Sequence, residues 1–124
     1  METTKTTISE EKGNLIVSLT FQFALEIVKF VEILENNRKY AVANQLIKSG
    51  TSIGANVREA QHAESKADFI HKLKIAAKEA EETEYWLEIC QQIESYPNCG
   101  NLLDKVLSIK KVLSKIISSS KSSL

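Results

Sequence analysis

Apolar residues recur at three- and four-residue steps through four separate segments of the chain. The first segment contains Ile16, Leu19, Phe23, Ile27, Phe30 and Leu34. Because 3.6 residues make one helical turn, this spacing places the apolar side chains on one face and predicts a helix from residue 14 to about residue 35. The polar turn at residues 36–39 separates it from a second helix, expected over residues 40–62.

The third segment has the most regular apolar face of the four. It consists of Phe69, Leu73, Ala76, Ala80, Thr83, Leu87 and Cys90. Ser65 and Asp68 have the spacing of a capping box, which predicts the start of this helix, and Pro97 with Gly100 must end it. The fourth segment repeats the same steps through Leu102, Val106, Ile109, Leu113 and Ile116.

Four helices with short connections predict an all-α fold, an antiparallel up-down four-helix bundle. We expect the bundle to span residues 14–117. The polar residues 1–13 are interpreted as a flexible N-terminal segment, and the Ser-rich residues 118–124 as a disordered tail.

The second helix combines apolar with unusually small residues. Gly50 and Gly54 lie on the same side as Leu46, Ile53 and Val57. Each glycine costs a helix roughly 1 kcal/mol relative to alanine, so a compensating interaction is required. Close approach of a neighbouring helix backbone supplies it, which indicates a tight bundle.

The amino-acid composition limits the classes of function that we expect for this protein. The 124 residues include 16 basic and 16 acidic side chains, so the net charge is zero, unlike that of a uniformly basic nucleic-acid binder. No signal peptide or apolar run long enough to cross a membrane is present, and we expect a cytoplasmic protein. Cys90 and Cys99 do not suggest a disulfide framework, and Cys90 is expected to be buried.

No cofactor, metal or catalytic site is predicted. Glu59 and His62 have the Glu-x-x-His spacing of di-iron bundles, but only one copy exists, whereas such sites need two with further carboxylates. Cys90 and His71 have no evident catalytic partners. We therefore expect a protein that is not an enzyme.

Apolar residues also lie on faces opposite the predicted core. The hypothesis is that they form an interface between identical subunits. The alternative is that the N-terminal segment and the serine tail fold over them. The residues concerned are Phe21, Leu25, Val28, Ile75, Trp86 and Ile93.

Glu84 falls near the core side of the third helix, where an unpaired carboxylate is costly to bury. We expect it to find donors among Ser49, Ser52 and Asn56, which follow one edge of the second helix. Such a polar core fixes helix register, and a ligand- or proton-binding site is the alternative.

Charge is unevenly placed along the chain. Residues 79–94 contain six glutamates and no basic residue. In an up-down bundle the end of the second helix, the start of the third and the end of the fourth share one pole, which should be basic. The hypothesis is that this pole holds a phosphate backbone. The alternative is that the polarity only keeps the surface solvated and aligns subunits. The candidate nucleic-acid contacts are Arg58, Lys66, Lys72, Lys74, Lys111 and Lys115.

Three stretches closely resemble one known family. Residues 45–60 read Gln-Leu-Ile-Lys-Ser-Gly-Thr-Ser-Ile-Gly-Ala-Asn-Val-Arg-Glu-Ala, residues 63–73 read Ala-Glu-Ser-Lys-Ala-Asp-Phe-Ile-His-Lys-Leu, and residues 80–87 read Ala-Glu-Glu-Thr-Glu-Tyr-Trp-Leu. Together with residues 23–28, they are similar to the four-helix bundle proteins encoded in 23S rRNA intervening sequences. The resemblance covers roughly residues 18–115.

The resemblance implies a bundle that assembles as a ring, typically a homopentamer. Relatives include accessory proteins of diversity-generating retroelements, which bind nucleic acid and a reverse transcriptase. We therefore expect a homo-oligomeric scaffold that binds structured RNA, or a nucleic-acid-processing protein, through its basic pole. The alternative is a protein–protein adaptor that binds no nucleic acid.

Overall fold

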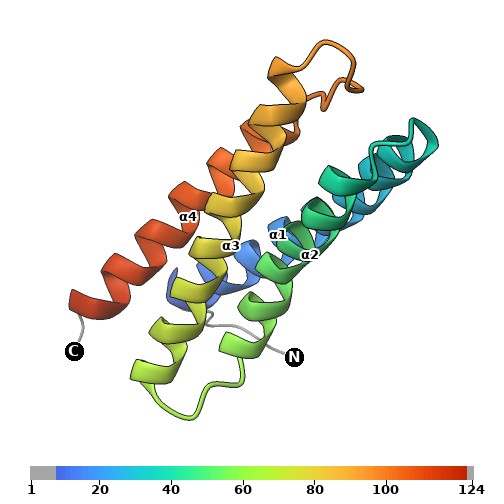
Figure 1. Ribbon diagram of the computed structural model, residues 1–124. Helices are drawn as coiled ribbons and strands as arrows, with labels where there is room; N and C mark the ends of the chain where they lie inside the picture. Colours follow the sequence, from blue (N-terminus) through green and yellow to red (C-terminus); the bar gives the residue numbers. More distant parts are fainter. Residues whose placement is uncertain (1–7, 123–124) are drawn as a thin grey trace, which may run out of the picture.

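The described part of the chain is built from four helices. A computed structural model describes residues 8–122, with side chains described from residue 15 onward. The helices are α1 (Ile8–Asn36), α2 (Tyr40–Ala60), α3 (Lys66–Gln92) and α4 (Leu102–Ser122). Each helix packs on the next along the chain, and α4 packs on α1, so the four surround one core (Figure 1). Within residues 8–122 there is no strand, which confirms the predicted all-α class.

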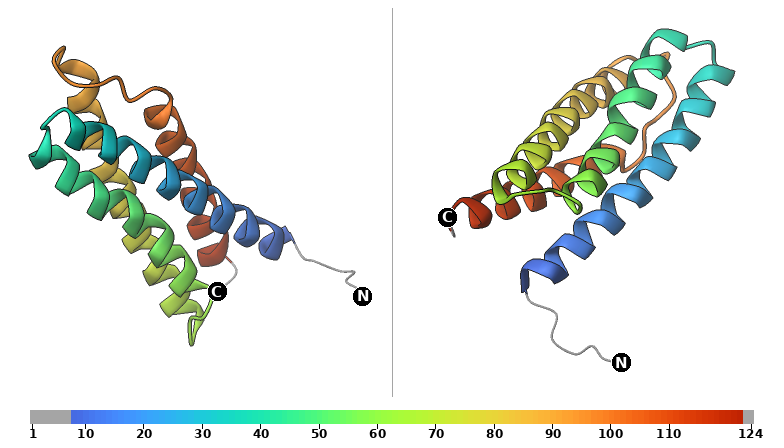
Figure 2. Two further views of the ribbon diagram at one scale, coloured as in Figure 1. Left: turned by 90° about the vertical axis from the view of Figure 1, so that its right-hand side faces the viewer. Right: turned by 90° about the horizontal axis from the view of Figure 1, so that it is seen from below.

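Consecutive helices run in opposite directions (Figure 2). Along the α2–α3 contact, Ser49 meets Thr83, whereas Glu59, farther along α2, meets Lys72, which is earlier in α3. The contacts between α3 and α4 show the same reversal, because Lys110 meets Glu84, whereas Lys121, later in α4, interacts with Lys74, which is earlier in α3. The predicted up-down arrangement is therefore the observed one.

The first and last helices pack least closely of the four neighbouring pairs. In both views of Figure 2, α1 crosses α4 instead of running along its length. The Lys105 ammonium of α4 reaches the Glu26 carboxylate of α1 at 2.5 Å near the crossing. A hollow of about 410 Å³ lies beside this ion pair, with Phe23 and Ile109 in its apolar lining.

The buried residues follow the predicted faces closely. All of the predicted apolar positions of α2 and α4 are buried, as are those of α3 from Leu73 to Cys90. Two positions differ, because Leu19 and Phe69 are only half-buried while their neighbours Thr20 and Ile70 are buried. At each of these two points the buried position lies one residue later in the helix than predicted.

The two glycines of α2 face α1, as close packing requires. A methyl group at Gly54 would lie 3.3 Å from the Thr20 carbonyl oxygen, so here the α1 backbone approaches directly. A methyl group at Gly50 would lie 2.8 Å from Cγ2 of Ile27, a fully buried side chain. The close approach predicted from these glycines is confirmed, although at Gly50 the neighbour is a side chain.

The outer ends of the bundle differ from the predicted bounds. Helix α1 begins at Ile8 and α4 continues to Ser122, whereas the sequence predicts a flexible segment to residue 13 and a disordered tail from residue 118. The single Gly13 costs about 1 kcal/mol, too little to end a helix whose later turns are packed. Lys121 lies in the last turn of α4, where a cation complements the helix dipole. Residues 1–7 and 123–124 of these two predicted segments lie outside the described residues.

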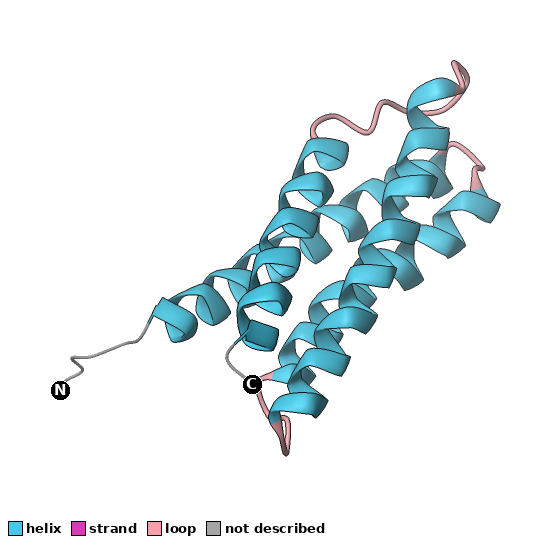
Figure 3. Ribbon diagram, turned by 90° about the vertical axis from the view of Figure 1, so that its left-hand side faces the viewer, coloured by secondary structure: helices cyan, strands magenta, loops and turns pink. Residues whose placement is uncertain are grey.

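Three loops join the helices, and that between α3 and α4 is the longest (Figure 3). Helix α1 ends in a Schellman motif, because the Lys39 and Arg38 amides donate to the Leu34 and Glu35 carbonyls. Arg38 has φ 62° there, a left-handed conformation that usually belongs to glycine. At the start of α3, the Ser65 hydroxyl accepts from the Asp68 amide at 3.0 Å, as predicted. The Asp68 carboxylate accepts from the Glu64 amide, one residue before the expected partner.

Candidate nucleic-acid interface

Three helix ends meet at one pole of the bundle: the end of α2, the start of α3 and the end of α4 (Figure 1). Arg58 lies in the last turn of α2, and Lys66 is the first residue of α3. Lys72 and Lys74 follow within about two and a half turns, while Lys111 lies at the middle of α4 and Lys115 one turn later. The predicted cations thus come from the three elements that the sequence assigned to this pole.

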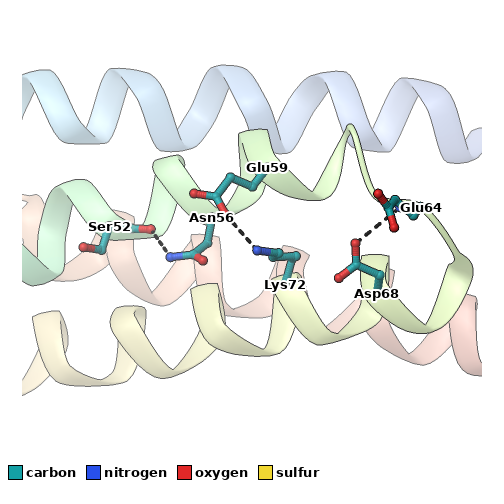
Figure 4. Close-up of polar contacts among 6 residues, drawn as sticks. All are labelled: Ser52, Asn56, Glu59, Glu64, Asp68 and Lys72. Carbon is teal, nitrogen blue, oxygen red and sulfur yellow. Dashed lines mark hydrogen bonds and ion pairs between the residues drawn. The ribbon is translucent and has the colours of Figure 1, made fainter.

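Arg58 and Lys72 each contact a neighbouring helix within the protein. The Lys72 ammonium donates to the Glu59 carboxylate at 2.8 Å and joins α2 to α3 (Figure 4). The hydrogen bond and the charge of Glu59 raise the pKa of Lys72. The Arg58 guanidinium lies 4.8 Å from the centre of the Phe21 ring, a cation–π contact between α2 and α1. These two residues help to hold the helices together, so they are weaker candidates for binding a ligand.

Lys74 has a different neighbour, the ammonium of Lys121 at the end of α4. Direct interaction with the Lys121 side chain and repulsion between the two positive charges lower the pKa of Lys74. Lys111 and Lys115 are exposed and one helical turn apart. Lys121 was not among the predicted contacts, because periodicity along one helix does not reveal which residues of another helix lie beside it.

Carboxylates gather on the second half of α3, away from this pole. A shallow hollow on the outer side of the helix is lined by four carboxylates, by Tyr85 and by one cation, Lys78; the carboxylates are those of Glu81, Glu82, Glu84 and Glu88. Nearby Glu79 is half-buried, and burial raises the pKa of its carboxyl group. The zero net charge of the chain therefore conceals a separation of charge along α3.

Glu84 faces α4 and not the predicted polar edge of α2. Its carboxylate accepts from the Lys110 ammonium at 2.5 Å, and Glu81 binds the same ammonium at 2.8 Å. The hydrogen bonds that Lys110 donates to Glu81 and Glu84 raise the pKa of Lys110. Glu84 does find a hydrogen-bond donor, as predicted, but the donor is Lys110 of α4 and not a residue of α2. The reason is that the Glu84 side chain lies on the side of α3 that faces α4.

The polar edge of α2 has its own partners. Ser49 is buried, and its hydroxyl forms a 2.9 Å hydrogen bond with the buried hydroxyl of Thr83. The Ser52 hydroxyl donates to the Lys48 carbonyl, and the Asn56 amide donates to the Ser52 carbonyl, both within α2 (Figure 4 draws the latter). The α2–α3 polar lock therefore consists of Ser49 and Thr83, and the sequence identified only half of it.

The six apolar residues predicted for a subunit interface occupy different environments. Phe21, Leu25 and Val28 are exposed on the outer side of α1, each by about two fifths of its surface. Ile93 is 44% exposed but follows the end of α3 as its C-cap. Ile75 is half-buried, and Trp86 is half-buried against the core with its indole N–H donating to Glu82 at 3.2 Å. The outer side of α1 is thus the most continuous apolar surface of this set.

Neither cysteine has the environment of a reactive thiol. Cys90 and Cys99 are both free and buried. Burial and the neighbouring Cys99 raise the pKa of the Cys90 thiol to about 11, so it stays protonated at neutral pH. Across residues 8–122 no three potential metal ligands of the His, Cys, Asp or Glu type come together. None of the helices described is long and apolar enough to cross a membrane.

Comparison with known proteins assigns the chain to a family. Residues 12–115 match the family model of the 23S rRNA-intervening sequence protein. A crystal structure from Bacteroides thetaiotaomicron, described as a protein of unknown function from the S23 ribosomal protein family, is 43% identical and superposes with a TM-score of 0.81. The match covers 86% of this chain and 98% of the other. No curated protein matches the sequence. The chain therefore belongs to the 23S rRNA-intervening sequence protein family.

Proposed function

We propose that this protein is a homo-oligomeric scaffold that binds structured RNA through the pole where α2, α3 and α4 meet. The observation that carries the proposal is the group of lysines from two helices at that pole. Lys74 interacts there with Lys121, and two further exposed lysines of α4 extend from the pole toward the middle of the helix, Lys115 and Lys111. Cations from separate helices that converge on one surface suit a phosphate backbone, whose charges are regularly spaced.

The family name supports the choice of RNA as the ligand. It refers to intervening sequences of 23S rRNA, and the similar crystal structure is described in terms of a ribosomal protein family. No pattern of exposed aromatic residues interleaves with the lysines, so binding would depend on phosphate contacts and tolerate changes of sequence. Assembly into a ring would repeat the lysine group and multiply weak contacts.

Salt dependence tests this proposal directly. Fluorescence anisotropy of a labelled RNA hairpin is measured with the purified protein at about 50 and 200 mM salt. Contacts to about four phosphates lower the affinity roughly 100-fold over this range. The double variant Lys111→Glu/Lys115→Glu should weaken binding further and reduce the salt slope. These positions are preferable to Lys72, because reversal of Lys72 also breaks its ion pair with Glu59.

A matched control separates this pole from general charge effects. Lys29 on α1 and Lys48 on α2 are exposed lysines away from the α3–α4 side. Lys29→Glu/Lys48→Glu changes the net charge equally and should leave most of the affinity. Equal loss in both double variants, or wild-type binding weaker than about millimolar at low salt, would refute an RNA interface at this pole.

A protein–protein adaptor is the second candidate, and the exposed apolar side of α1 favours it. Phe21, Leu25 and Val28 form a surface that a partner protein would cover. Half-buried Trp86 offers less area for such a partner than the sequence suggested. Two results together would favour this candidate. The wild type would bind a partner protein but no RNA, and Leu25→Glu would lose the partner while remaining folded.

A further inference from the structure

The hollow beside the crossing of α1 and α4 has an apolar floor. Phe23 and Ile109, which line it, are almost fully buried, and Leu19 next to them is half-buried. Because α1 crosses α4 and does not run along it, the two helices diverge beside the contact (Figure 2). The volume of about 410 Å³ is that of a site for a small molecule.

One carboxylate at this hollow is not neutralised. The lining contains two carboxylates and one ammonium group, and Glu26 and Lys105 form an ion pair at 2.5 Å that cancels one charge of each sign. The remaining carboxylate belongs to Asp104, which is exposed and, within the part of the chain that the structure describes, forms no ion pair. The hollow therefore keeps one uncompensated negative charge, which repels anions and attracts cations.

Uncharged polar side chains complete the lining, namely those of Gln22, Asn101 and Ser108. Among the described residues, none of these three side chains forms a hydrogen bond, so their oxygens can accept from a ligand. The dipole of α4 by itself accounts for a carboxylate in the first turn of the helix, where Asp104 lies. It does not account for an apolar floor and three free acceptors around the same hollow.

An organic cation matches all of these properties. Its ammonium group would pair with Asp104 and donate to the amide oxygens beside it, while an apolar group attached to it would cover Phe23 and Ile109. An inorganic cation would leave the apolar floor uncovered, and an uncharged apolar molecule would leave the carboxylate unpaired. We infer that the hollow between α1 and α4 binds a small organic amine, with one ammonium group joined to an apolar group and Asp104 as its counter-ion.

Three probes of nearly equal size separate charge from shape. At neutral pH phenethylamine is a cation, phenethyl alcohol is uncharged and hydrocinnamate is an anion. Each is titrated at millimolar concentration into the full chain, while NMR follows the methyl signals of Leu19 and Ile109. Phenethylamine should shift these signals in a saturable manner and bind about threefold more tightly than the alcohol, the ratio expected for one exposed ion pair. Hydrocinnamate should bind most weakly of the three.

Three variants locate the site. Asp104→Asn keeps the size of the side chain and removes its charge, so the amine should bind no more tightly than the alcohol. Glu32→Gln removes one charge from an exposed position of α1 outside the hollow and should keep the preference for the amine. Ser108→Trp places a large side chain at the hollow and should abolish binding of every probe. Because Ser108 is exposed, this variant should remain folded, which urea unfolding checks.

Equal affinity of the wild type for the amine and the alcohol would overturn the inference, as would a preference that survives in Asp104→Asn. The absence of saturable shifts with any probe would show that the hollow holds no small molecule. The hollow is lined by the first half of α4, whereas the proposed RNA contacts begin at the middle of that helix. The RNA titration therefore succeeds or fails independently of this experiment.

Discussion

The buried hydroxyls of Ser49 and Thr83 form a polar contact between α2 and α3 inside an otherwise apolar core. Thr83→Val keeps the shape of the side chain but leaves the Ser49 hydroxyl without its partner. This should lower the free energy of unfolding by about 1–3 kcal/mol. The double variant Ser49→Ala/Thr83→Val removes both hydroxyls and should recover most of the loss.

Urea unfolding of the wild type, the two single variants Ser49→Ala and Thr83→Val, and the double variant measures the coupling of this pair as a double-mutant cycle. A coupling close to zero would mean that the hydroxyl pair contributes nothing to the α2–α3 contact. Thr51→Val provides a control, because Thr51 is half-buried on α2 and its hydroxyl donates within its own helix. It should change stability by less than the Thr83 substitution.

Gly50 shows how a single residue controls the packing of α2 on α1. Alanine gains about 1 kcal/mol in helix propensity, but its methyl group would lie 2.8 Å from the buried Ile27 side chain. Overpacking of this kind costs about 1–3 kcal/mol, so Gly50→Ala should be neutral to destabilising by about 2 kcal/mol. Asn44→Ala, at an exposed position of α2, should stabilise. Equal gains from both substitutions in urea unfolding would contradict the close packing of α1 on α2.

At the scale of helices, Lys110 joins α4 to α3 through Glu81 and Glu84. These carboxylates raise the pKa of Lys110 in the folded protein. A raised lysine pKa stabilises the fold fully below the unfolded value of about 10.4, and this contribution is lost as pH rises through the folded value. Between about pH 10 and pH 12 the wild type should therefore lose more stability than Lys110→Met.

The measurement is urea unfolding at several alkaline pH values, with Lys48→Met as the matched control. Lys48 is exposed on α2, and its replacement should leave the pH dependence of the wild type unchanged. If Lys110→Met and the wild type lost stability in parallel, the ion pairs would have no influence on the α3–α4 contact.

The four helices themselves could be predicted because each has a continuous apolar face, from Ile16 to Leu34 in α1 and from Leu102 to Ile116 in α4. The polar contacts could be predicted only in part. A helical periodicity gives the direction of Glu84 on α3 but not which of two neighbouring helices lies on that side. Glu84 pairs with Lys110, and Ser49 pairs with Thr83. Both pairings depend on the axial offset between neighbouring helices, which loop lengths and close packing determine together.

The helix ends were also less predictable than the helix faces. Gly13 and the serines from Ser118 suggested ends on grounds of propensity, but both helices continue past these points. Propensity differences of about 1 kcal/mol per residue are smaller than the stabilisation from packing of the adjoining turns. The interaction of Lys74 with Lys121 required the structure, because the two residues belong to different helices.

For the molecule as a whole, the outer side of α1 is the surface on which the proposed assembly depends. Phe21, Leu25 and Val28 are all exposed there. Leu25→Glu should shift the protein toward a monomer in sedimentation at micromolar concentration, because a charge buried in an interface is costly. Leu107→Glu is a matched control, since Leu107 is an exposed leucine of α4. A wild type that sediments as a monomer throughout this range would exclude the assembly.

Every helix packs on its neighbour in the chain, and among the four helices described the only pairing distant in sequence, between α1 and α4, is also the least extensive. Loops of a few residues therefore bring most partners together, and little chain entropy is lost in closing them. Proteins with such local contacts fold within microseconds to milliseconds. The α2–α3 pair, which packs most extensively, is the natural place for folding to begin. The crossing of α1 over α4 would then form last and open first, so amide hydrogens along that crossing should exchange before those of α2 and α3.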